Sequence, residues 1–242
     1  MPVAPAEVAT AIRILDETID RVAAEYAEKL APAIARVWND EIGEIRRDLS
    51  IWVQKQSTDN GWVPRYFEFS FGLPMTDERD PRSVPDPVIV GDGFRLHGSV
   101  DLIEQHSHRR TLRVTDHKTG KNRSKPDLVV DGGRVLQPVL YAMAVERALG
   151  QRVEEARLYF ATTAGGFAEC PVPVNDYTCG QGLHVLTIID RAVEQAFLVP
   201  APAERACTWC DFRPVCGPRE SERIRRKAPD RLADLEALRS MR

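Results

Sequence analysis

The fold is decided by the stretch Gly98-Ser-Val-Asp-Leu-Ile-Glu-Gln-His-Ser-His-Arg-Arg-Thr-Leu-Arg-Val-Thr-Asp-His-Lys118, which is predicted to form a β-hairpin. Side chains alternate between the two faces of a strand, so Val114, Asp116 and Lys118 share one face of its second strand. A turn with an even number of residues predicts the cross-strand pairs Ile103–Val114, Asp101–Asp116 and Ser99–Lys118. One face of the hairpin therefore runs from an apolar core into a charged site.

Two carboxylates and an ammonium group at one end of a hairpin are suited to metal-assisted hydrolysis. Like charges directly across a ladder destabilise it, and a divalent cation held by Asp101 and Asp116 reverses that effect. Mg²⁺ binds carboxylate oxygens and keeps several waters, so two acids suffice to hold it beside a phosphate. Lys118 can then orient or deprotonate the attacking water, or neutralise charge on the phosphate. The alternative, an ordinary ion pair among solvated strand-end charges, is left open by the spacing alone.

The composition is that of an ordinary globular chain. The 242 residues are 43% hydrophobic and 29% charged, which allows one sizeable core with a small appended lobe. There is no run of about 18 apolar residues and no leader pattern, so we expect no membrane span, no signal peptide and a cytoplasmic location. The net charge of -3 argues against broad polyanion binding. Basic residues nevertheless form two clusters, Arg109, Arg110, Lys118, Lys121, Arg123 and Lys125 around the hairpin, and Arg213, Arg219, Arg223, Arg225, Arg226, Lys227 and Arg231 near the end.

The segments before the hairpin are predicted to be two helices and a strand. Apolar residues recur at helical spacing over residues 6–30 and again in a second helix that has Pro32 in its first turn. Both apolar stripes are expected to pack in the core or between helices. The aromatic stretch 65–71 is predicted to be a strand that carries Glu68, and the proline-rich segment 73–92 a surface loop.

The segments after the hairpin are predicted to continue the α/β pattern. A basic loop follows Lys118, and its Lys121 and Arg123 are candidate phosphate contacts. A helix that tolerates Pro138 in its first turn then carries Gln137 and Tyr141, which are four residues apart and therefore share a face. Strands over residues 157–161 and 167–172 and a helix over 181–198 complete the core.

Three motifs resemble those of the PD-(D/E)XK nucleases, in the RecB/AddB-type branch. Gly98-x-x-Asp101 and Asp116-His-Lys118-Thr-Gly resemble motifs II and III, and Gln137-Pro-Val-Leu-Tyr141 resembles the Gln-x-x-x-Tyr motif that follows them. The resemblance implies a restriction-endonuclease-like α/β core with a mixed central sheet flanked by helices. It further implies cleavage of DNA with Mg²⁺ or Mn²⁺ held by the two aspartates, with Lys118 serving the water.

The resemblance also implies supporting residues, and one expected residue is absent. Gln137 and Tyr141 support the active site and approach nucleic acid in this branch. A glutamate on the first core strand makes Glu68 an accessory candidate, with an outward-facing strand carboxylate as the alternative. The motif I histidine of the branch lies upstream of that strand, but no histidine precedes His97 in this chain.

A cysteine cluster, Cys207-Thr-Trp-Cys210-Asp-Phe-Arg-Pro-Val-Cys216, follows the core. In a reducing compartment such spacing favours zinc or an iron–sulfur cluster over disulfides. The run resembles the C-terminal motif of AddB-type nucleases and of CRISPR-associated RecB-like exonucleases, which implies a [4Fe–4S] cluster. Zn²⁺ is the alternative metal.

The fourth ligand of that cluster is not evident in this sequence. In the resembled families it lies upstream of the nuclease motifs, whereas no cysteine here precedes Cys170. Cys170 and Cys179 are expected to be buried small apolar residues. Either one of them replaces the missing ligand, or the ligand was lost, or an upstream segment of a longer protein carried it.

Taken together, the sequence predicts a helical segment over residues 1–62 packed on a nuclease core over 63–199. A cysteine lobe with a basic helix is predicted over 200–242. The predicted function is metal-dependent DNA cleavage of the RecB/AddB type, by an exonuclease of DNA repair or recombination. A helicase subunit or domain remains open as a partner. Two other functions remain open as well, a DNA-binding module of the same fold without catalysis and a zinc-stapled interaction domain.

Overall fold

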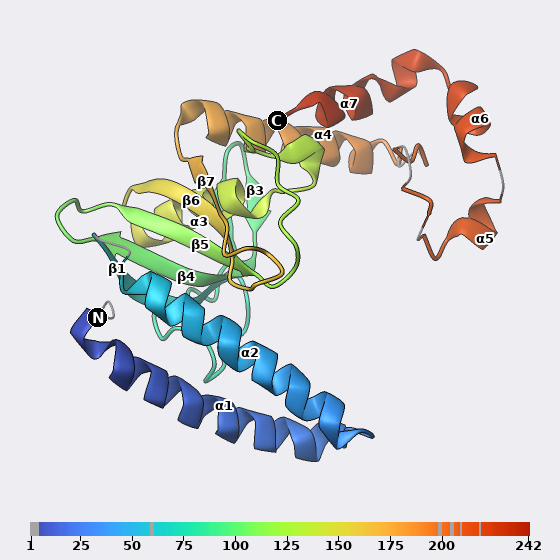
Figure 1. The fold of residues 1–242 in the computed structure, drawn as a ribbon. Coiled ribbons are helices and arrows are strands. Elements are labelled where there is room, and N and C mark those ends of the chain that lie inside the picture. The colour runs from blue at the N-terminus through green and yellow to red at the C-terminus, as the bar shows by residue number, and fades with distance from the viewer. Residues whose placement is uncertain (1–4, 59–60, 198–199, 204–205, 209, 218) are drawn as a thin grey trace.

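A five-stranded mixed sheet forms the centre of the molecule (Figure 1). The computed structural model describes residues 5–58, 61–197, 200–203, 206–208, 210–217 and 219–242. The strands are β1 (Trp62–Phe71), β2 (Val88–Val90), β3 (Phe94–Leu96), β4 (Gly98–His106), β5 (Leu112–Lys118), β6 (Val153–Phe160) and β7 (Glu169–Pro173). The α-helices are α1 (Val8–Leu30), α2 (Ala35–Gln56), α3 (Gln137–Leu149), α4 (Asp176–Glu194), α5 (Arg213–Cys216), α6 (Glu220–Arg225) and α7 (Pro229–Ser240). The predicted fold class, a mixed sheet flanked by helices, is confirmed.

The order of strands in the sheet is β1-β4-β5-β6-β7, and β2 and β3 form a separate two-stranded sheet. Strands β5 and β6 are parallel, because α3 carries the chain back between them, and the other neighbours in the large sheet are antiparallel. Pro138 lies in the first turn of α3, where its missing N–H costs no helical hydrogen bond.

The hairpin of β4 and β5 has the predicted register over its inner part. Ile103 lies opposite Val114, and the ladder ends at Leu102 opposite Thr115. The expected pairs beyond that point do not form between the described strands. Instead, the Asp101 carboxylate accepts a hydrogen bond of 2.7 Å from the backbone N–H of His117. The two strands therefore separate where the charged residues begin.

The two faces of the sheet are packed in different ways. On one face, Ile103 and Val114 join an apolar cluster with Ala142 and Val145 of α3. Because side chains alternate along a strand, the opposite face carries a second set of residues. That set is polar but fully buried, with Glu104, Arg113, Thr115 and Arg157.

The helical hairpin of α1 and α2 buries little of its apolar surface. Ile19 is the only buried residue among those described in α1, and Val53 is the only one in α2. Large apolar residues near the hairpin tip are exposed, Tyr26, Leu30, Ile34 and Val37. Of the two expected arrangements, packing in the core or between helices, the structure shows the second, because α1 packs on α2 and leaves the rest of its apolar surface uncovered. Pro32 lies in the linker before α2, which begins at Ala35.

The C-terminal helices extend away from the sheet (Figure 1). Helix α7 packs against α4 and the short 3-10 turn Asp131–Gly133, while α5 and α6 stand clear of the strands. None of the described helices is long and apolar enough to cross a membrane.

Candidate active site

The structure brings Asp101, Asp116 and Lys118 together at the point where β4 and β5 separate. The Lys118 ammonium lies 2.5 Å from Asp116 Oδ2. The Asp101 carboxylate caps the backbone N–H of His117, which stands between the other two residues in sequence. The predicted pair of acids and their lysine therefore form one cluster, although the backbone ladder does not extend that far.

Asp116 is the most unusual carboxylate of this cluster. Its side chain is 5% exposed, and its Oδ2 atom is buried without a partner in hydrogen-bonding geometry, although the Lys118 ammonium is close. Burial raises the pKa of Asp116; the nearby Lys118 ammonium opposes this, and the charge of Asp101 adds to it. The site thus holds a buried carboxylate that one lysine does not fully compensate.

Lys118 is positioned by α3. Its ammonium donates a hydrogen bond of 2.8 Å to Gln137 Oε1, at the first residue of that helix. Tyr141, one turn later, lies edge-on to Phe71, with ring centroids 6.1 Å apart. A Cβ atom at Gly98 would lie 3.2 Å from Tyr141 Cε1, so a larger residue there would push on this ring. The predicted motif residues therefore contact one another across three separate segments.

Glu68 is also near the site, through an irregularity in β1. Phe67 pairs with Leu102 and Phe69 with Val100, which places Glu68 opposite Asp101. Glu68 has a φ of 51°, a left-handed conformation that is uncommon for a residue with a Cβ. Its pKa is raised by burial and by the charge of Asp101.

The sequence analysis did not predict two contacts beside the site, one made by Ser99 and one made by His117. The Ser99 hydroxyl donates a hydrogen bond of 3.3 Å to Glu68 Oε2. His117, besides its backbone bond to Asp101, has its ring edge-on to Trp52 of α2. Burial lowers the pKa of His117, and the charge of Asp101 opposes this shift. Alternation along β5 could have predicted only that His117 faces away from Asp116.

The chemistry of the site fits a divalent cation. Hard cations take carboxylate oxygens, and Asp101 and Asp116 supply them beside the Lys118 ammonium. Over the described ranges, no three His, Cys, Asp or Glu side chains are grouped closely enough to hold a metal ion by themselves. Two carboxylates are sufficient for Mg²⁺ or Mn²⁺, because these ions keep several water ligands.

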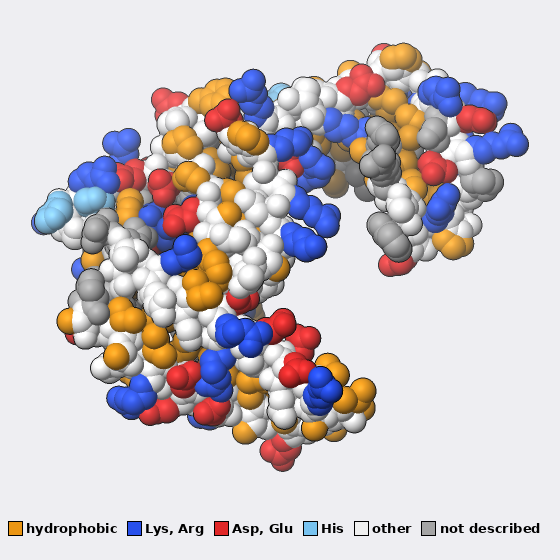
Figure 2. Space-filling model, viewed as in Figure 1, with side chains coloured by type: hydrophobic (Ala, Val, Ile, Leu, Met, Phe, Trp, Pro, Cys, Tyr) orange, Lys and Arg blue, Asp and Glu red, His pale blue; other side chains and the backbone are white. Residues whose placement is uncertain are grey.

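The basic loop after β5 lies next to the site and is open to solvent. Lys121 and Arg123 are exposed, and Lys125 forms an ion pair of 3.0 Å with Asp131. Figure 2 shows the molecule hollowed between the α1/α2 hairpin and the C-terminal helices, with Lys and Arg side chains on the wall of the hollow. The surface beside the candidate site is therefore suited to a polyanion.

The cysteine cluster lies in the lobe that holds α5. Cys207 and Cys210 are half-buried and Cys216 is exposed. Burial raises the pKa of the Cys207 thiol, and Glu220, Cys210 and Cys216 add to this effect. Among the described residues, these three thiols are not grouped closely enough to hold a metal ion by themselves.

The two remaining cysteines lie in the core rather than in the lobe. Cys170 and Cys179 are both half-buried, not fully buried as expected. Strand β7, which contains Cys170, and α5, which ends at Cys216, lie well apart in Figure 1. In this arrangement Cys170 is not placed to complete the ligand set of the lobe.

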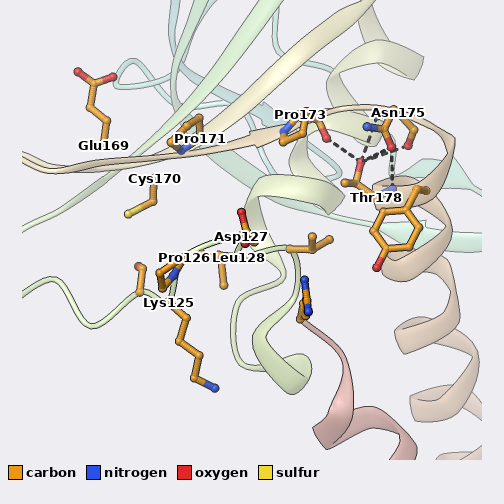
Figure 3. A pocket seen from close by; sticks show the side chains of 14 residues that line it. Lys125, Pro126, Asp127, Leu128, Glu169, Cys170, Pro171, Pro173, Asn175 and Thr178 are labelled. Atoms are coloured by element: carbon orange, nitrogen blue, oxygen red, sulfur yellow. Dashed lines mark hydrogen bonds between the residues drawn. The ribbon is translucent and has the colours of Figure 1, made fainter.

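A separate pocket of about 540 Å³ lies beside β7 (Figure 3). Its wall includes Lys125, Pro126, Cys170, Pro171 and Tyr177. None of the acidic residues of the candidate site lines this pocket. Its lining gives it no evident part in the chemistry of the site.

Comparison with known proteins identifies the family. A model of the PD-(D/E)XK nuclease superfamily matches residues 2–217. A search of curated proteins gave no significant match. Among solved structures, one titled "Crystal structure of SSO0001" aligns with 84% of this chain and 81% of its own chain, at 19% sequence identity. The TM-score of this alignment is 0.33, which is too low to support an argument from structure. The chain belongs to the PD-(D/E)XK nuclease superfamily, whose members are generally metal-dependent nucleases that act on DNA.

Proposed function

We propose that this protein is a metal-dependent DNA nuclease of the RecB/AddB type, an exonuclease that acts in DNA repair or recombination. One observation carries the proposal. Asp101, Asp116 and Lys118 converge where β4 and β5 separate, and burial raises the pKa of the Asp116 carboxyl there although the Lys118 ammonium lies 2.5 Å from its Oδ2 atom. Such an arrangement costs stability unless a ligand compensates it.

Asp101 and Asp116 would hold Mg²⁺ or Mn²⁺, with Glu68 as an accessory carboxylate. When bound, the ion polarises the phosphate and lowers the pKa of its water. Lys118 orients the attacking water or donates to a phosphate oxygen, and the 2.8 Å hydrogen bond that its ammonium donates to Gln137 Oε1 fixes the direction of that group. Tyr141, one turn after Gln137 on α3, packs edge-on against Phe71 and beside Gly98, where we assign it a supporting role.

The exposed basic loop supports contact with the DNA backbone. Lys121→Gln and Arg123→Gln should weaken DNA binding for all sequences. Each should also reduce the slope of log Kd against log salt concentration by about one, as expected for the loss of one phosphate contact. Cleavage rates at saturating DNA should change little, because neither side chain contacts the carboxylates. A helicase subunit or domain is the partner class that the RecB/AddB type implies.

The cysteine run supports a [4Fe–4S] cluster held by Cys207, Cys210 and Cys216. We place these residues in a C-terminal lobe over residues 200–242, which follows a nuclease core over residues 63–199. Protein purified without oxygen should then be brown, with a broad band near about 400 nm and about four irons per chain. Stoichiometric zinc without iron would instead favour the zinc-stapled domain. Serine variants of Cys170 and Cys179, measured separately for iron content, test each as the fourth ligand.

The decisive experiment incubates purified protein with end-labelled single- and double-stranded DNA, with and without Mn²⁺. Asp116→Ala should lower cleavage by orders of magnitude while DNA binding persists, and Lys118→Ala should abolish cleavage while Mn²⁺ still binds. Asp40→Ala removes a carboxylate from an exposed pair on α2 and serves as the matched control. Equal cleavage by wild type and Asp116→Ala would mean that this site does not cut DNA.

The alternative function is DNA binding without catalysis. The absence of a histidine before His97 favours it, because the motif I position of the resembled branch lies in that part of the chain. If wild type and Asp116→Ala both bind DNA and neither cuts it with Mg²⁺ or Mn²⁺, the non-catalytic function is correct. End-labelling also separates exonuclease from endonuclease products in the same experiment.

A further inference from the structure

Arg79 lies beside the candidate site on the loop between β1 and β2. The loop is fastened along the free edge of β1, since the backbone N–H of Asp80 donates to the carbonyl of Glu68 at 3.3 Å. The N–H of Ser70 donates to the Ser83 hydroxyl at 2.9 Å. The part of the loop that carries Arg79 is thus tied to the strand segment that carries Glu68.

A short chain of polar contacts joins Arg79 to the site. Its guanidinium donates to the buried Ser70 hydroxyl at 3.4 Å. Ser70 pairs with Ser99, and the Ser99 hydroxyl donates to Glu68 Oε2 at 3.3 Å. The charge of Arg79 reaches Glu68, because it lowers the pKa of that carboxyl against the larger effects of burial and of Asp101.

The Arg79 guanidinium forms no ion pair with the described carboxylates. It is half-buried, and no carboxylate of the described residues lies within ion-pair distance of it. Burying part of a guanidinium without a counter-charge is unfavourable unless a ligand provides one. By contrast, Arg113 and Arg157 on the far face of the sheet are both paired with Glu104.

With one divalent ion bound, the carboxylates and Lys118 of the site leave no net positive charge to attract a DNA phosphate. One divalent ion and Lys118 only neutralise the carboxylates of Glu68, Asp101 and Asp116. A phosphate that reaches the site therefore meets no excess positive charge from these groups. Arg79 provides that charge, in a planar group that can bind two oxygens of a phosphate at once.

We propose that Arg79 is a substrate-binding residue that contacts a phosphate oxygen of the DNA strand at this site. The inference rests on the proposed nuclease function. It assigns the loop between β1 and β2 a role in holding the substrate, whereas the basic loop after β5 contacts the backbone farther along. The role is electrostatic, so it does not depend on the hydrogen bond to Ser70.

The test compares Arg79→Gln with Arg82→Gln. Glutamine can still donate to Ser70 but has no charge, and Arg82 lies on the same loop, stacked 5.6 Å from the Tyr66 ring, so the control removes an equal charge. Arg79→Gln should raise the Kd for DNA, measured with Ca²⁺ in place of Mn²⁺, by about ten- to a hundredfold, with a salt slope smaller by about one. Arg82→Gln should change the Kd less than about twofold. Arg79→Lys should recover part of the loss.

The outcomes separate this inference from the proposed function. If wild type cuts DNA and Arg79→Gln binds and cuts like Arg82→Gln, Arg79 does not bind phosphate, while the nuclease function stands. If wild type does not cut, the proposed nuclease function fails, and the binding measurements still decide the role of Arg79. A loss in Arg79→Ala that Arg79→Gln does not share would assign Arg79 to the support of Ser70 and overturn the inference. Thermal melting of each variant checks that the loop change has not unfolded the protein.

Discussion

Removal of the Glu104 side chain is predicted to destabilise the fold strongly. Its side chain is 1% exposed and accepts hydrogen bonds of 2.8 and 2.9 Å from Arg113. It also accepts a bond of 2.9 Å from Thr115 and one of 3.2 Å from Arg157. One carboxylate on β4 therefore compensates two buried guanidinium groups on β5 and β6.

Glu104→Ala would leave those cations without their main counter-charge. Arg157 keeps Glu169 at 2.6 Å, while Arg113 keeps Glu155 at the longer distance of 3.9 Å and the face of Trp62. Removing one partner of a buried ion pair costs about 3–5 kcal/mol, because the remaining charge is buried uncompensated. For a chain of this size, such a loss lowers Tm by about 6–20 °C.

The measurement is thermal and urea unfolding of Glu104→Ala beside Glu17→Ala. Glu17 forms an exposed pair of 2.7 Å with Arg13 one turn away on α1, and its loss should cost only about 0.3–0.5 kcal/mol. Well below its Tm, Glu104→Ala should still cut DNA, since Glu104 does not touch the candidate site. A loss of stability below about 1 kcal/mol in Glu104→Ala would refute the reasoning that this network is essential to the sheet.

Three further predictions concern the candidate site. Gln137→Ala removes the 2.8 Å bond that directs Lys118 and should lower the cleavage rate by about 10–100-fold without changing the Kd for DNA, as single-turnover kinetics would reveal. Gly98→Ala places a methyl group 3.2 Å from the Tyr141 ring and should cost about 1–3 kcal/mol in urea unfolding, and an unchanged midpoint would contradict this packing. Burial, opposed by Lys118, leaves the pKa of Asp116 in the folded protein above its ordinary value. Ionised Asp116 therefore destabilises the fold, and this penalty is fully present above the raised pKa. The penalty disappears as pH falls below the pKa of Asp116 in the unfolded chain. In metal-free protein, Asp116→Asn should therefore raise Tm at neutral pH but not in acid, and a higher Tm for wild type at neutral pH would contradict the raised pKa.

Sequence reasoning anticipated the elements that depend on local spacing. The even turn of the β4–β5 hairpin set Ile103 opposite Val114, and the position of Pro138 marked the first turn of α3. The four-residue spacing of Gln137 and Tyr141 put both on one side of that helix. These features follow from strand alternation, turn parity and helical periodicity, which act over a few residues.

Burial of the N-terminal helices could not be predicted in the same way. Apolar spacing in α1 and α2 correctly indicated helices, but it did not reveal how much of each stripe a neighbour would cover. Leu30 and Ile34 at the hairpin tip are 63% and 62% exposed. Periodicity states which residues share a face, whereas packing partners far along the chain decide whether that face is buried.

Local patterns along the chain were enough to predict the β4–β5 hairpin and to put Asp101, Asp116 and Lys118 near its open end. Only the tertiary structure separated the two strands beyond Thr115, placed Glu68 opposite Asp101 and brought Arg79 to the same place. The physical reason is the length of chain between these parts. Turn geometry fixes the register of adjacent strands, but β1 and β4 meet across about thirty residues, and only burial of the whole sheet selects that pairing.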